Sequence, residues 1–438
     1  MAKSVEDAVT TTVTTAGKTV FYSGLTVLVT LSSMMFFPLA FLKSFGYAGI
    51  SVVLLAVGGA LIPLPAILAI LGKRVDKGVV RRGAITPKED GRWAATARFV
   101  MRRPVAVVVV SLIILGVLAA PIKGIAFGQV DARDLPANNK AAIASQLITD
   151  RFPGQEGSPI EIIIPGGASK TSEIDTYLSE IAKVKGVIRV NDAQTSGDDV
   201  RITAVHSMPS RTTAAEEMIH AIRAIDAPEG TLIGGAAADF TDTQDGISHT
   251  LPWALGWIAL SVLILLFIFT GSIILPIKAV ILNVFSLGAT LGVLTWVFVD
   301  GHMKWLIGDF TTTGTMDTGT AILIAVVVFG LSMDYEVFLI SRIRDEHYAG
   351  KSNEEAVATG LQRSAKIITA AALLLALVFA AFITSGVTSI KFLGLGVAFA
   401  VLLDATLIRA LLVPALMRLL GENNWWAPKA LKRFTLLH

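Results

Sequence analysis

The chain has 438 residues, of which 53% are hydrophobic and 16% are charged, and its formal net charge is +3. Soluble proteins carry charges on about a quarter of their residues. The composition therefore argues against a soluble protein, and the small net charge does not indicate a nucleic-acid partner. The absence of cysteine excludes structural disulfides and cysteine metal sites.

Long uncharged windows separate the charges along the chain. A helix needs about 18–20 apolar residues to cross the ~30 Å hydrocarbon core of a bilayer, and the following windows reach that length: Thr19–Leu42, Ser44–Gly72, Pro104–Ile122, Gly246–Ile277, Ala279–Val299 and Ile367–Ile390. Two further apolar segments, Thr318–Ile340 and Phe392–Met417, contain charges. The sequence therefore predicts an α-helical polytopic membrane protein with about eight transmembrane helices.

Two basic segments set the predicted topology. Residues 73–103 hold ten Lys or Arg, and residues 342–366 hold five more. By the positive-inside rule both segments are cytoplasmic, so we expect a multi-pass protein of the cell (inner) membrane with both termini cytoplasmic. In the first segment, "GRWAATARFVMRRP" is either an interfacial helix anchored by Trp93 and Phe99 or a basic linker. The predicted spans are Thr19–Phe37, Tyr47–Leu71, Pro104–Pro121, Leu251–Thr270, Pro276–Val299, Thr318–Ile340, Ile367–Thr384 and Phe392–Met417.

A segment of soluble composition lies between the third and fourth spans, on the outside in this topology. We predict a strand at Ile160–Ile164, a helix at Ser172–Val184, strands at Val187–Val190 and Val200–Val205, a helix at Thr212–Ala224 and a strand at Thr231–Gly234. This order, β-α-β-β-α-β, is the ferredoxin-like arrangement. The preceding "DARDLPANNKAAIASQLITDRFPG" predicts a loop and then a helix with Pro136 in its first turn, and Asp239–Ser248 predicts a helix that continues into the next span.

The sequence contains an internal repeat. "KSVEDAVTTTVTTAGK" at Lys3–Lys18 matches "KSNEEAVATGLQRSAK" at Lys351–Lys366 with an offset of 348 residues, and Gly46 and Gly394 keep that offset. Such a repeat predicts two parallel halves related by an axis along the membrane normal. The counterpart of Asp334 would then fall before Met1, so we expect the chain to be incomplete: a truncated view of a longer protein, or a misplaced start.

The stretch "GLSMDYEVFLISRIRDEH" resembles the glycine-x-x-x-aspartate-tyrosine motif of the MMPL (mycobacterial membrane protein large) transporters of the resistance-nodulation-division superfamily. "DLPANN", "LPIKAVILNVFSLGATLGVLTWVFVDGH" and "LLDATLIRALLVPAL" are similar to that family as well. The resemblance implies a proton-driven exporter of lipids or other hydrophobic molecules, with twelve spans and two outside porter domains in a complete member. The first third of that pattern, including the first Asp-Tyr motif, has no counterpart in this chain.

With this resemblance, the chain divides into six predicted units. They are 1–72, the last two spans of the first half-repeat; 73–103, a cytoplasmic basic linker with an amphipathic helix; 104–126, the first span of the second half-repeat; 127–250, an extracytoplasmic α+β ferredoxin-like porter domain; 251–421, a five-helix membrane bundle; and 422–438, a cytoplasmic tail.

Asp334 and Tyr335 are the candidate proton relay. A charged aspartate at mid-membrane costs about 2.5–3.5 kcal/mol on insertion scales, and desolvation favours the neutral form of a carboxyl group. Each elementary charge that crosses 100 mV releases about 2.3 kcal/mol, so a few protons per cycle could drive a conformational change. The alternative is a neutral aspartic acid that is hydrogen-bonded to a neighbouring hydroxyl group and only joins helices. The resemblance implies that Asp and Tyr of the two halves exchange hydrogen bonds.

The remaining candidates are weaker. Asp404 and Arg409 lie five residues apart inside the last span, and we expect a helix-fixing ion pair, with a role in proton exit as the alternative. Possible relay neighbours, each with a packing role as the alternative, are Ser23; Gly330, a position for close helix approach; Ser332; Glu336, which could line water or pair with arginine; and Asn283 and Ser286, expected to form interhelical hydrogen bonds. No catalytic triad, phosphate loop or metal-ligand spacing is present, so we expect no enzyme activity, no metal and no cofactor besides the proton gradient.

Three functions remain open from the sequence. The first is proton antiport coupled to lipid export. The second is a membrane module that binds or senses a lipid without pumping, and the third is a non-functional remnant of a transporter. The expected partners are membrane lipids, a hydrophobic substrate, and the missing N-terminal half, a partner chain or a homo-oligomer. No spacing rule identifies the substrate.

Overall fold

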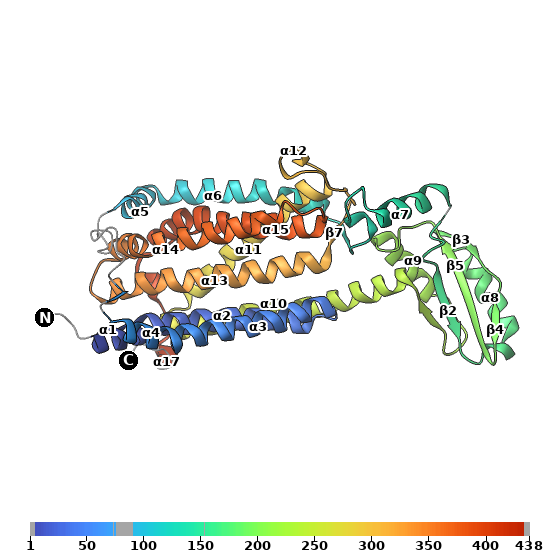
Figure 1. Ribbon diagram of the computed structural model, residues 1–438, viewed down its shortest axis with the longest axis horizontal. Coiled ribbons are helices and arrows are strands. Elements are labelled where there is room, and N and C mark those ends of the chain that lie inside the picture. The colour runs from blue at the N-terminus through green and yellow to red at the C-terminus, as the bar shows by residue number, and fades with distance from the viewer. Residues whose placement is uncertain (1–4, 73, 76–90, 153, 433–438) are drawn as a thin grey trace.

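The computed structural model describes residues 5–72, 74–75, 91–152 and 154–432. A bundle of long helices is joined at one end to a smaller domain built on a β-sheet (Figure 1). The first and last described helices, α1 (Val5–Thr12) and α17 (Lys429–Lys432), lie at the opposite end of the bundle, away from the sheet.

Eight helical segments are long and apolar enough to cross a membrane: Val5–Phe36, Ala40–Leu71, Pro104–Gly124, Ala236–Thr270, Ile274–Val299, Thr318–Tyr348, Asn353–Phe382 and Thr388–Trp425. All eight predicted spans are therefore confirmed as long helices. Several are longer than predicted, and only residues 349–352 separate two of them. The predicted loop at residues 342–366 is thus mostly helical, because Ala356, Val357 and Leu361 are apolar and become buried in the bundle.

The helices of the bundle are α1 (Val5–Thr12), η1 (Val13–Gly17), α2 (Lys18–Ser32), η2 (Ser33–Phe36), α3 (Ala40–Leu61), α4 (Pro63–Leu71), α5 (Arg92–Arg102), α6 (Pro104–Ala119), η5 (Ala120–Gly124), α10 (Ala236–Thr270), α11 (Ile274–Leu294), η8 (Thr295–Val299), α12 (Lys304–Ile307), α13 (Thr318–Tyr348), α14 (Asn353–Phe382), α15 (Thr388–Leu403), η9 (Asp404–Leu412), α16 (Val413–Leu420), η10 (Gly421–Trp425) and α17 (Lys429–Lys432). The central helix is α13, which packs against α2, α11, α14 and α15. Its polar side chains are therefore enclosed on several sides.

The helix α5 fills the predicted place of the interfacial helix, but it packs differently. Ala94, Ala97 and Met101 are buried against the bundle, and the backbone N–H of Ala94 donates to Gln362 Oε1 over 3.1 Å. Trp93 is half-buried against the same core, whereas Phe99 is 71% exposed. Of the two expected anchors, only Phe99 points away from the protein.

The smaller domain has the predicted ferredoxin-like topology. Its elements are β2 (Ile160–Ile164), α8 (Thr171–Ile181), β3 (Val187–Val190), β4 (Gln194–Ser196), β5 (Asp199–His206), α9 (Thr213–Arg223) and β6 (Leu232–Gly234). The antiparallel order β3-β5-β2-β6 confirms the prediction, and residues of β2 alternate in burial as a sheet with one covered face requires. The prediction missed β4, which forms a tight hairpin with β5.

The structure corrects the expected helix after "DARDLPANN". Pro136 lies in the preceding loop, and the helix α7 (Lys140–Arg151) begins four residues later. The side chain of Asn139 accepts a hydrogen bond from the backbone N–H of Ala141 over 2.9 Å. Asparagine is a favoured N-cap residue, and this cap sets the start of the helix.

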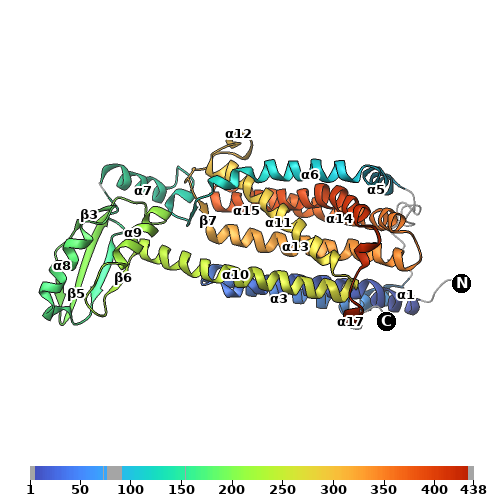
Figure 2. The ribbon, with the colours of Figure 1, turned by 180° about the vertical axis from the view of Figure 1, so that it is seen from behind.

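Several connections join the sheet domain to the bundle, among them the parallel pairing of β1 (Phe127–Gly128) with β7 (Met316–Asp317). The helix α10 runs without a break from the domain along the bundle (Figure 2), as predicted for Asp239–Ser248. In addition, Ser389 at the start of α15 donates from its backbone N–H and its hydroxyl to the Asp134 carboxylate, over 2.7 and 2.8 Å. Burial raises the pKa of Asp134, although both hydrogen bonds oppose that shift.

The internal repeat is visible in helix packing. A Cβ atom added to Gly46 in α3 would meet Leu31 O and Met34, and one added to Gly394 in α15 would meet Phe379 O and Phe382. All three pairs of equivalent positions are 348 residues apart. The two halves therefore form the same close helix contact.

After a slip of one residue, to an offset of 349, the repeat also extends to the backbone where α4 and α16 end. Gly72 has φ 49° and ψ −131°, and Gly421 has φ 54° and ψ −133°. Positive φ is accessible to glycine at little cost, so both halves use this residue to leave the helix in the same direction.

Candidate functional site

The Asp334 side chain lies where α13 packs against α2. The Ser23 hydroxyl of α2 donates a hydrogen bond to Asp334 Oδ1, and Asp334 itself is only partly buried. Among the described residues, no Lys, Arg or His lies within 4.0 Å of this carboxyl group. Asp334 therefore has a neutral partner and no ion-pair partner.

Asp404 and Arg409 form a buried ion pair in the last span. Arg409 Nε lies 2.7 Å from Asp404 Oδ2, and the two side chains are 3% and 4% exposed. Ser332 of α13 donates to Asp404 Oδ1 over 2.9 Å, and Arg409 donates to the Ser332 carbonyl oxygen. This network ties η9 to α13, as expected of a helix-fixing pair.

The π-helical form of η9 explains why these two residues meet. Positions five apart in an α-helix are rotated by about 140° from each other. In a π-helix the i→i+5 hydrogen bonds place such positions one turn apart on nearly the same face. The π segment Asp404–Leu412 thus brings the carboxylate and the guanidinium together.

Tyr335 contacts the same network from α13. The Arg409 guanidinium lies 5.5 Å from the centroid of the Tyr335 ring, within range of a cation–π contact. The Tyr335 hydroxyl makes no hydrogen bond to a carboxylate of the described chain. The expected donation to a facing helix is therefore not formed here.

A second group of polar side chains is buried where α11 faces α13. Glu336 is 3% exposed and Lys278 is 6% exposed, and their charges interact electrostatically. No ion pair within 4.0 Å is formed, and Glu336 Oε1 and Lys278 Nζ have no hydrogen-bond partner in the described structure. Among the described residues, Glu336 thus forms an ion pair neither with Lys278 nor with an arginine, the partner considered from the sequence, and both Lys278 and Arg409 act on it electrostatically.

Asn283 and Ser286 of α11 are also buried, at 4% and 1% exposure. Asn283 Nδ2 and Ser286 Oγ donate to no described residue, so the expected interhelical hydrogen bonds are absent. Gly330 faces Thr30 of α2, and a Cβ atom added to this glycine would lie 3.6 Å from Thr30 Cγ2, an ordinary contact distance. A methyl group at this position would therefore fit, so the contact between α2 and α13 does not require a glycine here.

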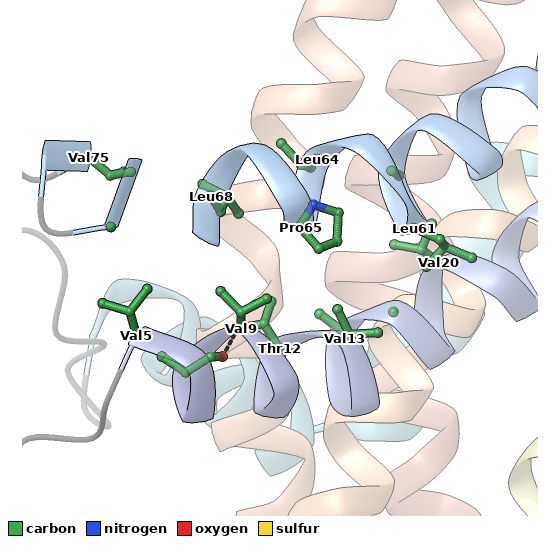
Figure 3. Close-up of a pocket in the computed structure, with 15 residues that line it drawn as sticks. Val5, Val9, Thr12, Val13, Val20, Leu61, Leu64, Pro65, Leu68 and Val75 are labelled. Atoms are coloured by element: carbon green, nitrogen blue, oxygen red, sulfur yellow. Dashed lines mark hydrogen bonds between the residues drawn. The ribbon is translucent and has the colours of Figure 1, made fainter. Parts of the chain in front are cut away.

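A separate groove of about 690 Å³ lies between α1 and α4 (Figure 3). None of the described residues that line it is charged, and Figure 3 shows Val9 and Val13 directed toward α4. The equivalent positions on α14, Val357 and Leu361, are buried because α13 and α5 cover that helix. The groove does not include the carboxyl groups of α13, so it is not part of the relay.

The match to a known family covers almost the whole chain. The model of the MMPL family matches residues 2–107 and 134–435. The chain belongs to the MMPL family. This result confirms the family resemblance of the "DY" stretch, and the superfamily placement is consistent with it.

Curated MMPL relatives are similar over 98% of this chain. A membrane protein of Streptomyces coelicolor is 39% identical over 432 residues, the trehalose monomycolate exporter MmpL3 of Mycobacterium tuberculosis 33% over 472, and the mycolic acid-containing lipids exporter MmpL11 of Mycolicibacterium smegmatis 32% over 450. The chain spans 59%, 50% and 46% of these relatives. A crystal structure of SecDF aligns with 95% of this chain and 50% of its own, at 10% identity and a TM-score of 0.49.

Sequence reasoning missed Lys278 as a member of the site. The signal was present, since Lys278 is the one charged residue between two long uncharged windows. What the sequence did not show is its partner, because α11 and α13 are separated by a loop and a short helix and their relative rotation is set only by packing.

Proposed function

We propose that this MMPL protein exports lipids or other hydrophobic molecules across the inner membrane, and that protons moving through Asp334 drive the export. The observation that carries the proposal is the pairing of Asp334 with the neutral Ser23 while Asp404 neutralises Arg409. A carboxyl group without a fixed cation can gain and lose a proton without breaking an ion pair. The names of the exporter relatives support lipids as the substrate class.

The Ser23 contact links the proton to helix motion. When Asp334 is ionised it accepts the hydroxyl hydrogen bond from α2. When it is protonated it is itself a donor, and the Ser23 hydroxyl can instead turn to a backbone carbonyl. Proton uptake therefore changes which groups hold α2 against α13, and this interface is where we place the conformational step.

Glu336 is a second carboxyl group in the proposed path. It lies two residues after Asp334, about 200° around the helix, and opposite Lys278 on α11. Its Oε1 atom has no hydrogen-bond partner among the described residues. Buried waters typically bind to such polar atoms, so we expect a buried water to donate a hydrogen bond to Glu336. We propose that protons pass between the α2 side and the α11 side of α13 through these two groups.

Proton flux in liposomes tests the proposal. The full chain is reconstituted with a pH-sensitive dye inside, a pH gradient is applied, and dye response is recorded with and without a trehalose monoester of a long-chain fatty acid. We expect Asp334→Asn to reduce lipid-stimulated proton entry to the level of empty liposomes. The matched control is Asp300→Asn, an exposed aspartate at the end of η8, which should keep normal flux.

Two results would contradict the proposal. Proton entry in Asp334→Asn equal to that of the unmodified protein would remove this carboxyl from the mechanism. Binding of the trehalose monoester without any proton entry, and unaffected by an uncoupler, would instead support a lipid-binding module that does not pump.

A further inference from the structure

A second cavity, of about 660 Å³, lies between η1, α2 and α13, and these elements reach the bundle end that holds α1 and α17. Three cations line it, Lys18, Arg342 and Arg344, together with one carboxylate, Asp345. The lining therefore has a net positive charge. This cavity is distinct from the Asp334 site, since neither Asp334 nor Ser23 lines it.

Two of the three cations have no ionic partner within the described chain. Arg344 pairs with Asp345 over 3.3 Å and donates to the carbonyl oxygen of Phe269. Lys18 is exposed, and Arg342 only stacks over the Phe338 ring, 5.6 Å from its centroid. The cavity thus presents unneutralised positive charge to an incoming anion.

The cavity lies at the end of two predicted membrane spans, where the phosphate groups of a bilayer are expected. Lys18 directly precedes the uncharged window Thr19–Leu42, and Arg342 follows the apolar part of α13, which ends at Ile340. The two cations thus mark the same end of two spans that pack together. Basic pockets between membrane helices at this level typically bind lipid headgroups.

The remaining lining suits the rest of a lipid. Phe21 and Tyr22 follow Lys18 into the span, and Phe269 stacks under Arg344, 4.6 Å from its guanidinium. Phe21 is 48% exposed. The Thr19 hydroxyl makes no hydrogen bond to a described residue and is a free donor for a phosphate oxygen. Along α2, a cation is thus followed by aromatic side chains, in the same order as the headgroup and the acyl chains of a lipid.

We propose that this cavity binds an anionic phospholipid from the leaflet on the side of the basic segments. Lys18 and Arg342 would contact its phosphate, Arg344 would add charge, and Phe21 would contact its acyl chains. Because η1, α2 and α13 all line the cavity, a bound lipid would contact the helices on both sides of the Ser23–Asp334 interface. The site does not depend on the proposed export activity.

Native mass spectrometry of the full chain in detergent tests this site. The protein is titrated with dioleoyl phosphatidylglycerol and, separately, with dioleoyl phosphatidylcholine. We expect tighter binding of phosphatidylglycerol, and a loss of about fivefold in affinity for each cation removed, hence about 25-fold for the double variant Lys18→Gln, Arg342→Gln. Phosphatidylcholine binding should change little.

A matched double variant, Arg92→Gln, Lys123→Gln, removes two exposed cations that do not line the cavity and should bind as the unmodified protein does. The charge-conserving variant Lys18→Arg, Arg342→Lys should retain the lipid preference. Equal loss in both charge-removing variants would show a general charge effect and overturn the proposal. Displacement of the lipid by millimolar inorganic phosphate would also overturn it, because the site would then recognise a free anion.

Discussion

The membrane bundle and the sheet domain differ in how far their charged side chains are buried. In the sheet domain the ion pairs lie at the surface, as between Arg201 and Glu161, whose side chains are 53% and 33% exposed. In the bundle the charges of Asp404, Arg409 and Glu336 are nearly completely buried. A surface pair contributes about 0–1 kcal/mol, whereas a charge inside a membrane is costly and marks a functional position.

The bundle also differs within itself, since its buried charges are not equally satisfied. Asp404 and Arg409 form an ion pair and exchange hydrogen bonds with Ser332, although Arg409 Nη1 has no hydrogen-bond partner among the described residues. Lys278 and Glu336 lack such bonds. We interpret the Asp404–Arg409 pair as a fixed support for α13. We interpret Lys278 and Glu336 as the groups whose protonation or contact with water changes.

The largest expected effect is from Arg409→Met. The substitution leaves Asp404 buried without its cation, and breaking a buried pair typically costs about 3–5 kcal/mol. Unfolding of the purified protein in mixed micelles, followed by circular dichroism, measures the loss. Asp404→Leu together with Arg409→Met should recover most of it. If the double variant is as unstable as the single one, the pair is not the reason for the loss.

Lys278→Met and Glu336→Gln are expected to have smaller effects, about 1–2 kcal/mol each, since each leaves one buried polar group without its electrostatic partner. The two groups interact, so the double variant should lose less than the sum of the two single losses, with a coupling of at least about 0.5 kcal/mol. A double-mutant cycle in the same unfolding assay gives this number. Strict additivity would mean that α11 and α13 are not coupled through these charges.

In the sheet domain, the pH dependence should come from His206. Burial lowers the pKa of its ring below the usual value, although the carbonyl oxygen of Ser158, 3.1 Å from Nε2, opposes that shift. The unfolded chain therefore binds a proton below about pH 6.5 that the folded domain does not. The free energy of unfolding should therefore decrease as the pH decreases below that point, by at most about 1.4 kcal/mol per pH unit.

Thermal melts at pH 7.5 and pH 5.5 check this expectation. His206→Gln should flatten the dependence, whereas a substitution of the exposed His302 should not. If the melting temperature of the His206→Gln variant depends on pH as strongly as that of the unmodified protein, another group is responsible for the pH dependence.

The smallest effect is expected from Arg201→Gln. It breaks an exposed cross-strand pair with Glu161, whose bonds are 2.9 and 3.0 Å long, and should cost about 0.2–1 kcal/mol. The same melting assay measures it. A loss as large as that of Arg409→Met would erase the difference between the two regions.

Several parts of the structure could be predicted from sequence for clear physical reasons. The spans follow from hydropathy, because an apolar run of that length has few other places to go. The strand order follows from alternating element types, and the repeat follows from polar matches such as Lys18 with Lys366. Each of these features can be read from the residues of a segment, or from a comparison of two segments, without knowing how helices pack.

Other features depend on how elements rotate against each other, and sequence spacing did not show them. Asp334 and Glu336 are two residues apart, yet only Glu336 is fully buried, because α11 covers its face of α13. The strand β4 has polar, exposed residues and no alternating pattern, so it was missed. The opposition of Lys278 and Glu336 likewise needed the packed helices.

The π segment between α15 and α16 also fixes the orientation of everything that follows it. Replacing its i→i+5 hydrogen bonds by ordinary i→i+4 bonds over the same residues would turn α16 relative to α15 and swing Val413 and Met417, now buried at 1% and 0% exposure, away from the bundle. The end of this span therefore depends on the π form being kept, whereas a conservative replacement at an outward position such as Thr406 leaves its phase intact.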